Sequence, residues 1–163
     1  NAQPQIESDG EAEIVFLDQL LIEVMSEFQL LIEREERDIY IQVSPESAKI
    51  KSHCDKLSRI LVNLLNNAFK YSDPGTKVEV VAQLTEQDLT ISVKDEGQGI
   101  APDDLDKIFK RLYRVETSRN MKTGGHGLGL AIAQELTHQL GGEITVESQY
   151  GLGSTFTFRL NLK

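Results

Sequence analysis

The chain has 163 residues, of which 39% are hydrophobic and 26% charged, and its 26 acids against 17 bases give a formal net charge of −9. This is the size and composition of one soluble globular domain, and the negative charge excludes nucleic acid and anionic lipid as general partners, because both are bound through a basic face. The single cysteine, Cys54, excludes an internal disulfide, and no apolar run approaches the roughly 18 to 20 residues that cross a bilayer, so we expect a cytoplasmic protein without a signal peptide.

The first half of the chain is predicted to contain two helices and several short strands. Residues 1–13 are acidic and poor in large aliphatic side chains, so we expect a linker or an added end there and a single domain over residues 14–163. Between Ile14 and Glu36, apolar residues recur at the spacing of one helical face, which predicts a long amphipathic helix after a short leading strand. Two strands, a second helix and a hairpin are expected at residues 38–43, 48–53, 55–71, 77–84 and 89–94.

The second half begins with a long stretch of weak periodicity. Residues 95–125 show only a short helix near residues 102–110, and a loop of this length in a compact domain is usually functional or mobile. The third helix and the last two strands are expected at residues 128–140, 143–148 and 154–162. Because the strands are grouped, we expect a two-layer α/β sandwich with about three helices on one face of a mixed, mostly antiparallel sheet.

The second predicted helix carries a polar stripe beside its core-facing side. Asn63, Asn67 and Lys70 fall within roughly 60° of one another on a helix. Asn is a poor helix former, and a stripe that only faces water more commonly holds Glu, Lys or Gln. The stripe is therefore either a row of edge asparagines with satisfied hydrogen bonds or a ligand platform. In the second case an Asn oxygen suits Mg²⁺, Lys70 supplies a charge for phosphate, and Tyr71 can lie against a flat apolar ring.

An acidic turn, DEGQGI at residues 95–100, directly follows an apolar strand. A carboxylate at a strand end can accept a hydrogen bond from an exocyclic amine, and the two glycines allow a ligand to approach the backbone. Hairpin exits with Asp and Gly are also common. Taken alone, this segment favours a plain turn.

The third predicted helix is opened by the glycine-rich sequence GGHGLGL at residues 124–130. Glycines before a helix N-terminus leave backbone N–H groups free to face an anion, and the helix dipole adds to the attraction, which favours phosphate. The spacing is neither G-x-G-x-x-G after a strand nor G-x-x-x-x-G-K-[ST]. Both the Rossmann and the P-loop interpretations are therefore excluded.

A basic segment lies between these two glycine-rich turns. Residues 107–122 carry six bases and one acid, a net charge of +5, which leaves −14 on the other 147 residues. A run of like charge is often only a solvated face. In this position, however, a basic mobile loop can close over a polyphosphate as a lid and neutralise it.

Together these segments resemble the ATP-binding catalytic domain of sensor histidine kinases, in the superfamily that also contains the gyrase B subunit and related chaperone and mismatch-repair ATPases. The matching motifs are the asparagine box at 63–71, the first glycine box at 95–100, the phenylalanine box at 108–114, the second glycine box at 125–130 and the terminal glycine motif at 151–156. They occur in order over nearly all of residues 14–162. Two positions depart from the pattern: Leu112 replaces a common second phenylalanine, and His126 replaces a small hydroxyl residue.

The resemblance implies a role for each matching residue. Asp95 would bond the adenine amine, Thr155 would support the Asp95 carboxylate, and Asn67 would help to hold Mg²⁺. The residues expected to support catalysis are Asn63, Lys70 and Arg114. The residues expected to bind the nucleotide are these three with Asn67, Tyr71, Asp95, Gly97, Gly99, Ile100, Arg119, Gly125, His126, Gly127, Leu128, Gly129, Leu130 and Thr155.

The implied activity is that of a phosphotransferase that uses Mg-ATP. Its acceptor would be a histidine on a separate dimerisation domain of the same parent protein, for relay to the receiver domain of a response regulator. Asn63 stands where gyrase-like relatives place a glutamate that activates water, and an amide cannot act as that base. Nothing before Ile14 offers an acceptor histidine, so we expect this domain to bind ATP without phosphorylating itself. We also expect it to be a monomer that makes no contact with a membrane, whether or not the parent protein is anchored in one. The alternatives are an ATP-hydrolysing switch of the gyrase-like class and a non-catalytic nucleotide-sensing domain.

Overall fold

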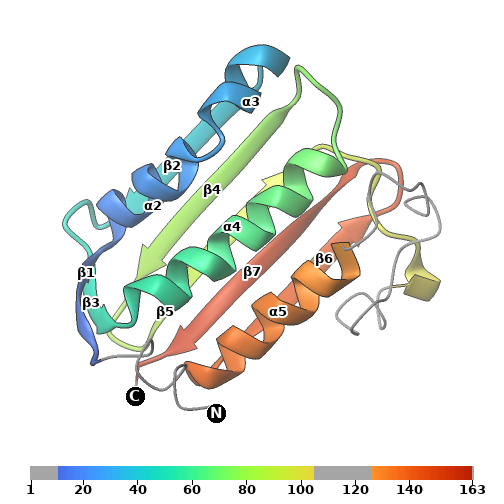
Figure 1. The fold of residues 1–163 in the computed structure, drawn as a ribbon. Coiled ribbons are helices and arrows are strands. Elements are labelled where there is room, and N and C mark those ends of the chain that lie inside the picture. Colours follow the sequence, from blue (N-terminus) through green and yellow to red (C-terminus); the bar gives the residue numbers. More distant parts are fainter. Residues whose placement is uncertain (1–10, 105–125, 163) are drawn as a thin grey trace, which may run out of the picture.

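The structure is built on a five-stranded sheet of order β2-β4-β5-β7-β6 (Figure 1). The computed structural model describes residues 11–104 and 126–162, with side chains for all of these except 126–129. The strands are β2 (Asp38–Ser44), β4 (Lys77–Leu84), β5 (Asp88–Asp95), β6 (Gly142–Gln149) and β7 (Gly153–Asn161). β2 and β4 run parallel, whereas the other neighbouring pairs run antiparallel. The prediction of a mixed, mostly antiparallel sheet is therefore confirmed.

In the described part of the chain, four α-helices cover one face of this sheet (Figure 1). They are α2 (Leu17–Ser26), α3 (Gln29–Glu35), α4 (Cys54–Lys70) and α5 (His126–Gln139). Side chains alternate along each strand, so that Val78, Val80 and Ala82 of β4 are buried beneath the helices while the residues between them are more exposed. The apolar stripe of α4 supplies the opposing layer of the core, and the two-layer sandwich expected from the sequence is confirmed.

The strands predicted at residues 38–43 and 48–53 are both present, but they belong to different sheets. β2 forms one edge of the main sheet, whereas β3 (Lys49–Ser52) pairs antiparallel with β1 (Glu13–Phe16). β1 begins one residue before the predicted start of the domain and leads directly into α2. This two-stranded ribbon ties the beginning of the domain to the segment that precedes α4.

The long helix predicted up to Glu36 is wrong, because α2 and α3 are separate helices that meet at Glu27 and Phe28. The N–H groups of these two residues bond to carbonyl oxygens three residues back, at 3.2 and 2.9 Å, so the last turn of α2 is tightened. The break turns Phe28 into the core, where its ring centre lies 5.1 Å from that of Phe69 on α4. Apolar spacing does not reveal this break because Leu31 and Ile32 of α3 pack against the same core as the buried residues of α2.

The other predicted elements agree with the structure to within two residues at each end. Gly141 has a φ of 84° and ends α5, as expected of a C-terminal glycine. Of the short helix predicted near residues 102–110, the structure describes a single 3₁₀ turn at Pro102–Asp104. The remainder of that helix and the predicted lid lie outside the described residues. Among the described helices, none is both long and apolar enough to cross a bilayer.

A left-handed residue ends α3. Glu36 has φ 56° and ψ 46°, a region in which a side chain is strained relative to glycine. We expect Glu36→Gly to raise the free energy of unfolding by about 0.5 to 1 kcal/mol in urea denaturation. Arg34→Gly, inside the same helix, should instead lower it by about 1 kcal/mol. A Glu36→Gly variant less stable than the wild type would contradict this.

Candidate functional site

The described residues of the predicted site converge at one end of the sheet. β5 ends there at Asp95, α4 ends at Lys70, and α5 begins at His126 (Figure 1). α4 and α5 lie side by side over the sheet and run in opposite directions (Figure 1). The fold therefore gathers motifs that are far apart in the sequence.

Asp95 is the last residue of β5, and it is only 4% exposed. Its Oδ1 accepts a hydrogen bond from the backbone N–H of Gly97 at 2.8 Å. Burial raises the pKa of Asp95 from 3.8 to about 6, against the opposing effects of backbone hydrogen bonds from Gly97 and Ser154 and of the charge on Arg37. Because a carboxylate has room for further hydrogen bonds, this group can accept one from a ligand amine.

Gly97 stands at a very close approach of two backbone segments. A Cβ at this position would collide with the carbonyl oxygen of Tyr71 and lie 2.8 Å from Asp95 Oδ1. The same Tyr71 carbonyl accepts the N–H of Gln98 at 3.2 Å, and the Tyr71 N–H donates to the carbonyl oxygen of Asn67 at 3.1 Å. Backbone contacts therefore join the end of α4 to the turn after β5.

The other side of this turn is held by the connection between β6 and β7. Ser148 Oγ accepts the N–H of Ile100 at 2.6 Å and lies 3.0 Å from Ser154 Oγ. Gly99, with a φ of 76°, lies so close to Gln149 that a Cβ would collide with its carbonyl oxygen. Ser148 is absent from the predicted site residues. Its sequence signal is its place in the alternation of β6, on the same side as buried Ile144.

The predicted contact of Thr155 with the Asp95 carboxylate is wrong by one residue. Asp95 pairs with Ser154 across β5 and β7, whereas Thr155 pairs with Lys94. Successive side chains of a strand point to opposite faces, so Thr155 lies on the face away from the helices. Ser154 is 7% exposed, shares the buried side with Phe156, and donates its backbone N–H to Asp95. Alternation counted back from the buried Phe156 was the signal that identifies Ser154.

The polar stripe of α4 borders the same region. Asn67 is 7% exposed, Asn63 is half-buried, and Lys70 is exposed at the helix end. Within the described residues the Asn67 side chain makes no hydrogen bond. An amide oxygen in this place suits Mg²⁺, which takes one or two oxygens from a protein and the rest from phosphate and water.

The glycine-rich segment forms the first turn of α5, which begins two residues earlier than predicted. The first four N–H groups of an α-helix have no partner within it, so those of residues 126–129 can face an anion. Leu130, one turn later, is 6% exposed and belongs to the core. Gly125, Arg114 and Arg119 lie outside the described residues, and their roles remain predictions.

Comparison with known proteins identifies relatives of this chain. Residues 53–163 match the family described as histidine kinase-, DNA gyrase B- and HSP90-like ATPase. The histidine protein kinase SaeS of Staphylococcus epidermidis is 41% identical over 150 residues, which cover 91% of this chain and 43% of SaeS. SaeS of Staphylococcus aureus is 40% identical over 151 residues, with the same shares covered. The chain thus spans less than half the length of these relatives.

Solved structures share the fold. The catalytic domain of the histidine kinase ThkA aligns with a TM-score of 0.81 at 23% identity, over 93% of this chain and 96% of that domain. Full-length ShkA in complex with AMPPNP aligns with a TM-score of 0.79 at 29% identity, over 91% of this chain and 30% of ShkA. The resemblance inferred from the sequence motifs is confirmed: the chain belongs to the family of histidine kinase-, DNA gyrase B- and HSP90-like ATPases and is homologous to the catalytic domain of histidine kinases.

Proposed function

We propose that this chain binds Mg-ATP and transfers the γ-phosphoryl group to a histidine on a separate dimerisation domain of the same parent protein, for relay to a response regulator. The observation that carries the proposal is the Asp95 carboxylate, buried at a strand end beside a glycine turn. Three relatives support it: SaeS is named a histidine protein kinase, ShkA is seen with AMPPNP, and ThkA is seen with the response regulator TrrA. Because the reaction consumes ATP, we assign this part of the parent protein to the cytoplasm.

Adenine recognition in this proposal depends on Asp95. The ionised carboxylate accepts a hydrogen bond from the exocyclic amine of the base, and the Ser154 hydroxyl lies on the same side of the sheet to support it. Tyr71 and Ile100, which flank the turn, contact the ring of the base. A base without an exocyclic amine, such as the hypoxanthine of inosine triphosphate, should therefore bind more weakly.

The triphosphate is proposed to lie between the end of α4 and the start of α5. Lys70 supplies a charge, and the free N–H groups of residues 126–129 bind phosphate oxygens. Arg114 and Arg119 of the basic segment add to the positive charge. Mg²⁺, when bound, neutralises charge on the phosphates, and Asn67 is the ligand that this chain offers it. Positioning and charge neutralisation are then the main sources of rate acceleration.

Asn63 explains why the phosphoryl group is kept for histidine. Its amide cannot take a proton from water, so hydrolysis is disfavoured. Incubation of the isolated domain with Mg-ATP tests this: we expect the melting temperature to rise with Mg-ATP concentration while ATP is consumed only slowly. Rapid hydrolysis would favour a gyrase-like switch, and an unchanged melting temperature would favour a domain with a degenerate site.

The role of Asn67 is tested by its removal. Asn67→Ala should weaken ATP binding in Mg²⁺ about tenfold or more, the cost of one ligand to a charged group, and have little effect in EDTA. The matched control is Asn66→Ala, since Asn66 is exposed on the same helix. Calorimetric titration with and without Mg²⁺ measures both. Equal losses with and without the metal would contradict a role in Mg²⁺ binding.

A further inference from the structure

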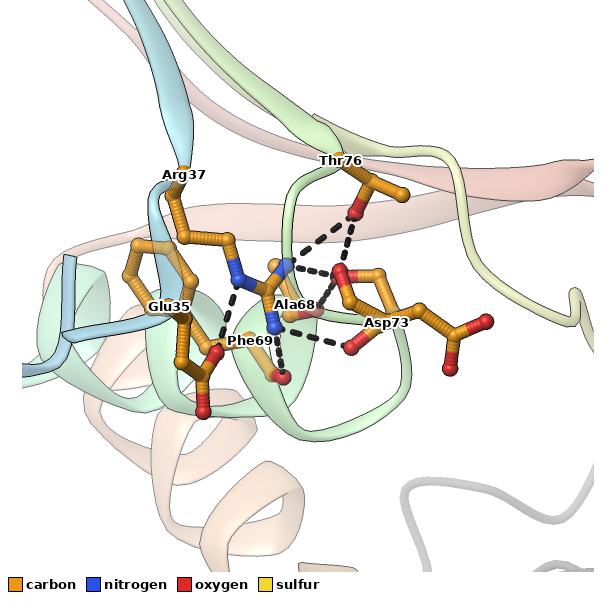
Figure 2. Close-up of polar contacts among 7 residues, drawn as sticks. Glu35, Arg37, Ala68, Phe69, Asp73 and Thr76 are labelled. Carbon is orange, nitrogen blue, oxygen red and sulfur yellow. Dashed lines mark hydrogen bonds and ion pairs between the residues drawn. The ribbon is translucent and has the colours of Figure 1, made fainter. Parts of the chain in front are cut away.

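Arg37 is a buried arginine between α3 and β2 whose guanidinium points into the end of α4 (Figure 2). Its Nε donates to Glu35 Oε1 at 2.8 Å. Its Nη1 donates to Ser72 Oγ at 2.6 Å and to Thr76 Oγ1 at 3.2 Å. Its Nη2 donates to the carbonyl oxygens of Phe69 and Ser72, each at 2.8 Å. The five N–H groups of a guanidinium are all accounted for by these contacts.

Two hydroxyl groups extend this network along the connection from α4 to β4. Ser72 Oγ, which accepts from Arg37, donates to the carbonyl oxygen of Ala68 at 2.7 Å. Thr76 Oγ1 donates in turn to the carbonyl oxygen of Asp73 at 2.6 Å (Figure 2). The guanidinium thus fixes both the last turn of α4 and the loop that follows it.

The charge of Arg37 is buried next to the C-terminal end of α4. Among the described residues its carboxylate partner is Glu35, whose side chain is 25% exposed, while the Arg37 side chain is 1% exposed. The remaining acceptors include carbonyl groups at the C-terminal end of α4, the negative end of the helix dipole. A buried ion pair adds little stability over a well-packed apolar side chain. The distinctive contribution of this arginine is then the position that it gives to the end of α4.

The network of Arg37 leads to the nucleotide site through one residue. Phe69 and Ser72, both bonded to Arg37, lie on either side of Tyr71 in this turn. The Tyr71 carbonyl receives the Gln98 N–H and bounds the space beside Gly97. Displacement of this turn would therefore displace the glycine turn after β5.

Arg37 also acts on Asp95 through its charge. It lowers the pKa of Asp95, opposing the larger effect of burial. Among the described residues, the other charged groups at this strand end include Glu96, next to Asp95 in the chain, and Lys77, whose backbone N–H donates to Glu96 Oε1 at 3.3 Å. Lys94 and Glu147 are also there, but on the face of the sheet away from the helices. Arg37 thereby favours the ionised carboxylate, the form that accepts a hydrogen bond from the adenine amine.

We propose that Arg37 is a positioning residue of the nucleotide site, which holds the Tyr71–Gln98 contact in place through its hydrogen bonds to Phe69 and Ser72. The inference rests on the proposed binding of ATP. Two separable properties of Arg37 are involved, since lysine keeps the charge but not the planar fork.

The test measures Mg-ATP affinity by calorimetry between pH 5 and 8 for the wild type, Arg37→Met, Arg37→Lys and Asp95→Asn, after circular dichroism has shown that each variant is folded. Arg37→Met should lose about tenfold in affinity at pH 8, and the pH at which binding weakens should move upward. Arg37→Lys should lose affinity with little change in that pH. The titration of ATP itself is common to all the proteins, so it does not contribute to a difference between them. Asp95→Asn should bind weakly at every pH.

Arg159→Met is the matched control, because Arg159 pairs with Asp88 at the opposite end of β5. It should leave both the affinity and the pH profile unchanged. If Arg37→Met does not fold, Arg37→Lys provides the test. The inference is overturned if Arg37→Lys binds Mg-ATP as tightly as the wild type does. The inference is likewise overturned if Arg37→Met folds and binds like the wild type. Failure of the wild type to bind Mg-ATP would instead refute the proposed function.

Discussion

Replacement of Asp95 with Asn is expected to weaken Mg-ATP binding about 100-fold or more at pH 8. The wild-type carboxylate accepts a hydrogen bond from the adenine amine, whereas an amide held by the same N–H groups of Gly97 and Ser154 turns a donor toward that amine. A charge-assisted hydrogen bond is lost and a repulsive contact replaces it. Calorimetric titration measures the change, with Asp88→Asn at the start of β5 as the matched control. Wild-type affinity in Asp95→Asn would contradict the assignment of the adenine site.

The same substitution should stabilise the nucleotide-free domain at high pH. The pKa of Asp95 rises from 3.8 in the unfolded chain to about 6 in the folded one, so the folded state holds its proton more tightly. The stability from this group is fully present below about pH 4 and is lost as the pH rises through 6, a difference of up to about 3 kcal/mol. The stability of Asp95→Asn does not fall in this way, because the amide does not ionise. Urea denaturation of both proteins at pH 5 and 8 should show the variant gaining on the wild type as the pH rises.

Replacement of Gly97 with Ala is expected to cost about 2 kcal/mol or more of folding stability and to weaken Mg-ATP binding more than tenfold. The added Cβ would collide with the Tyr71 carbonyl oxygen and press on Asp95 Oδ1, so the turn and the end of α4 must separate. Urea denaturation and calorimetric titration measure the two effects.

Gly75→Ala is the control for Gly97→Ala. Gly75 has a φ of 85° and no neighbouring atom within 4 Å of an added Cβ, so its cost is backbone strain of about 1 kcal/mol. Its affinity for Mg-ATP should be unchanged. If Gly97→Ala bound Mg-ATP as tightly as Gly75→Ala does, the close backbone contact at Gly97 would not be part of the binding site.

The parts of the fold that were predictable have a repeated local signal. α4 has an apolar stripe over several turns, and β4 and β5 alternate around a short turn, so their type and their ends follow from spacing. The family motifs include Asp95 and Asn67, each near the end of an element, and the structure brings these ends together at one end of the sheet. Local pattern was sufficient for these elements.

The remaining features depend on contacts that spacing does not contain. The separation of α2 from α3 follows from the packing of Phe28 on Phe69, a residue 41 positions later on a different helix. In the sequence, Arg37 is one of six consecutive charged residues at positions 33–38. Its burial depends on hydrogen bonds to Ser72 and Thr76, which are far from it in the chain. The choice of Thr155 over Ser154 is a different kind of error, since alternation from Phe156 was readable in the sequence. The basic segment of net charge +5 lies entirely outside the described residues and remains a prediction.

The most direct test of the account is phosphotransfer from ATP labelled at the γ position to the histidine-bearing dimerisation domain of the parent protein, mixed with this domain in Mg²⁺. We predict label on that domain that is lost on replacement of its acceptor histidine, together with no label on this chain and no transfer by Asp95→Asn. Tight Mg-ATP binding without any label transfer, or release of the label as free phosphate, would contradict the account.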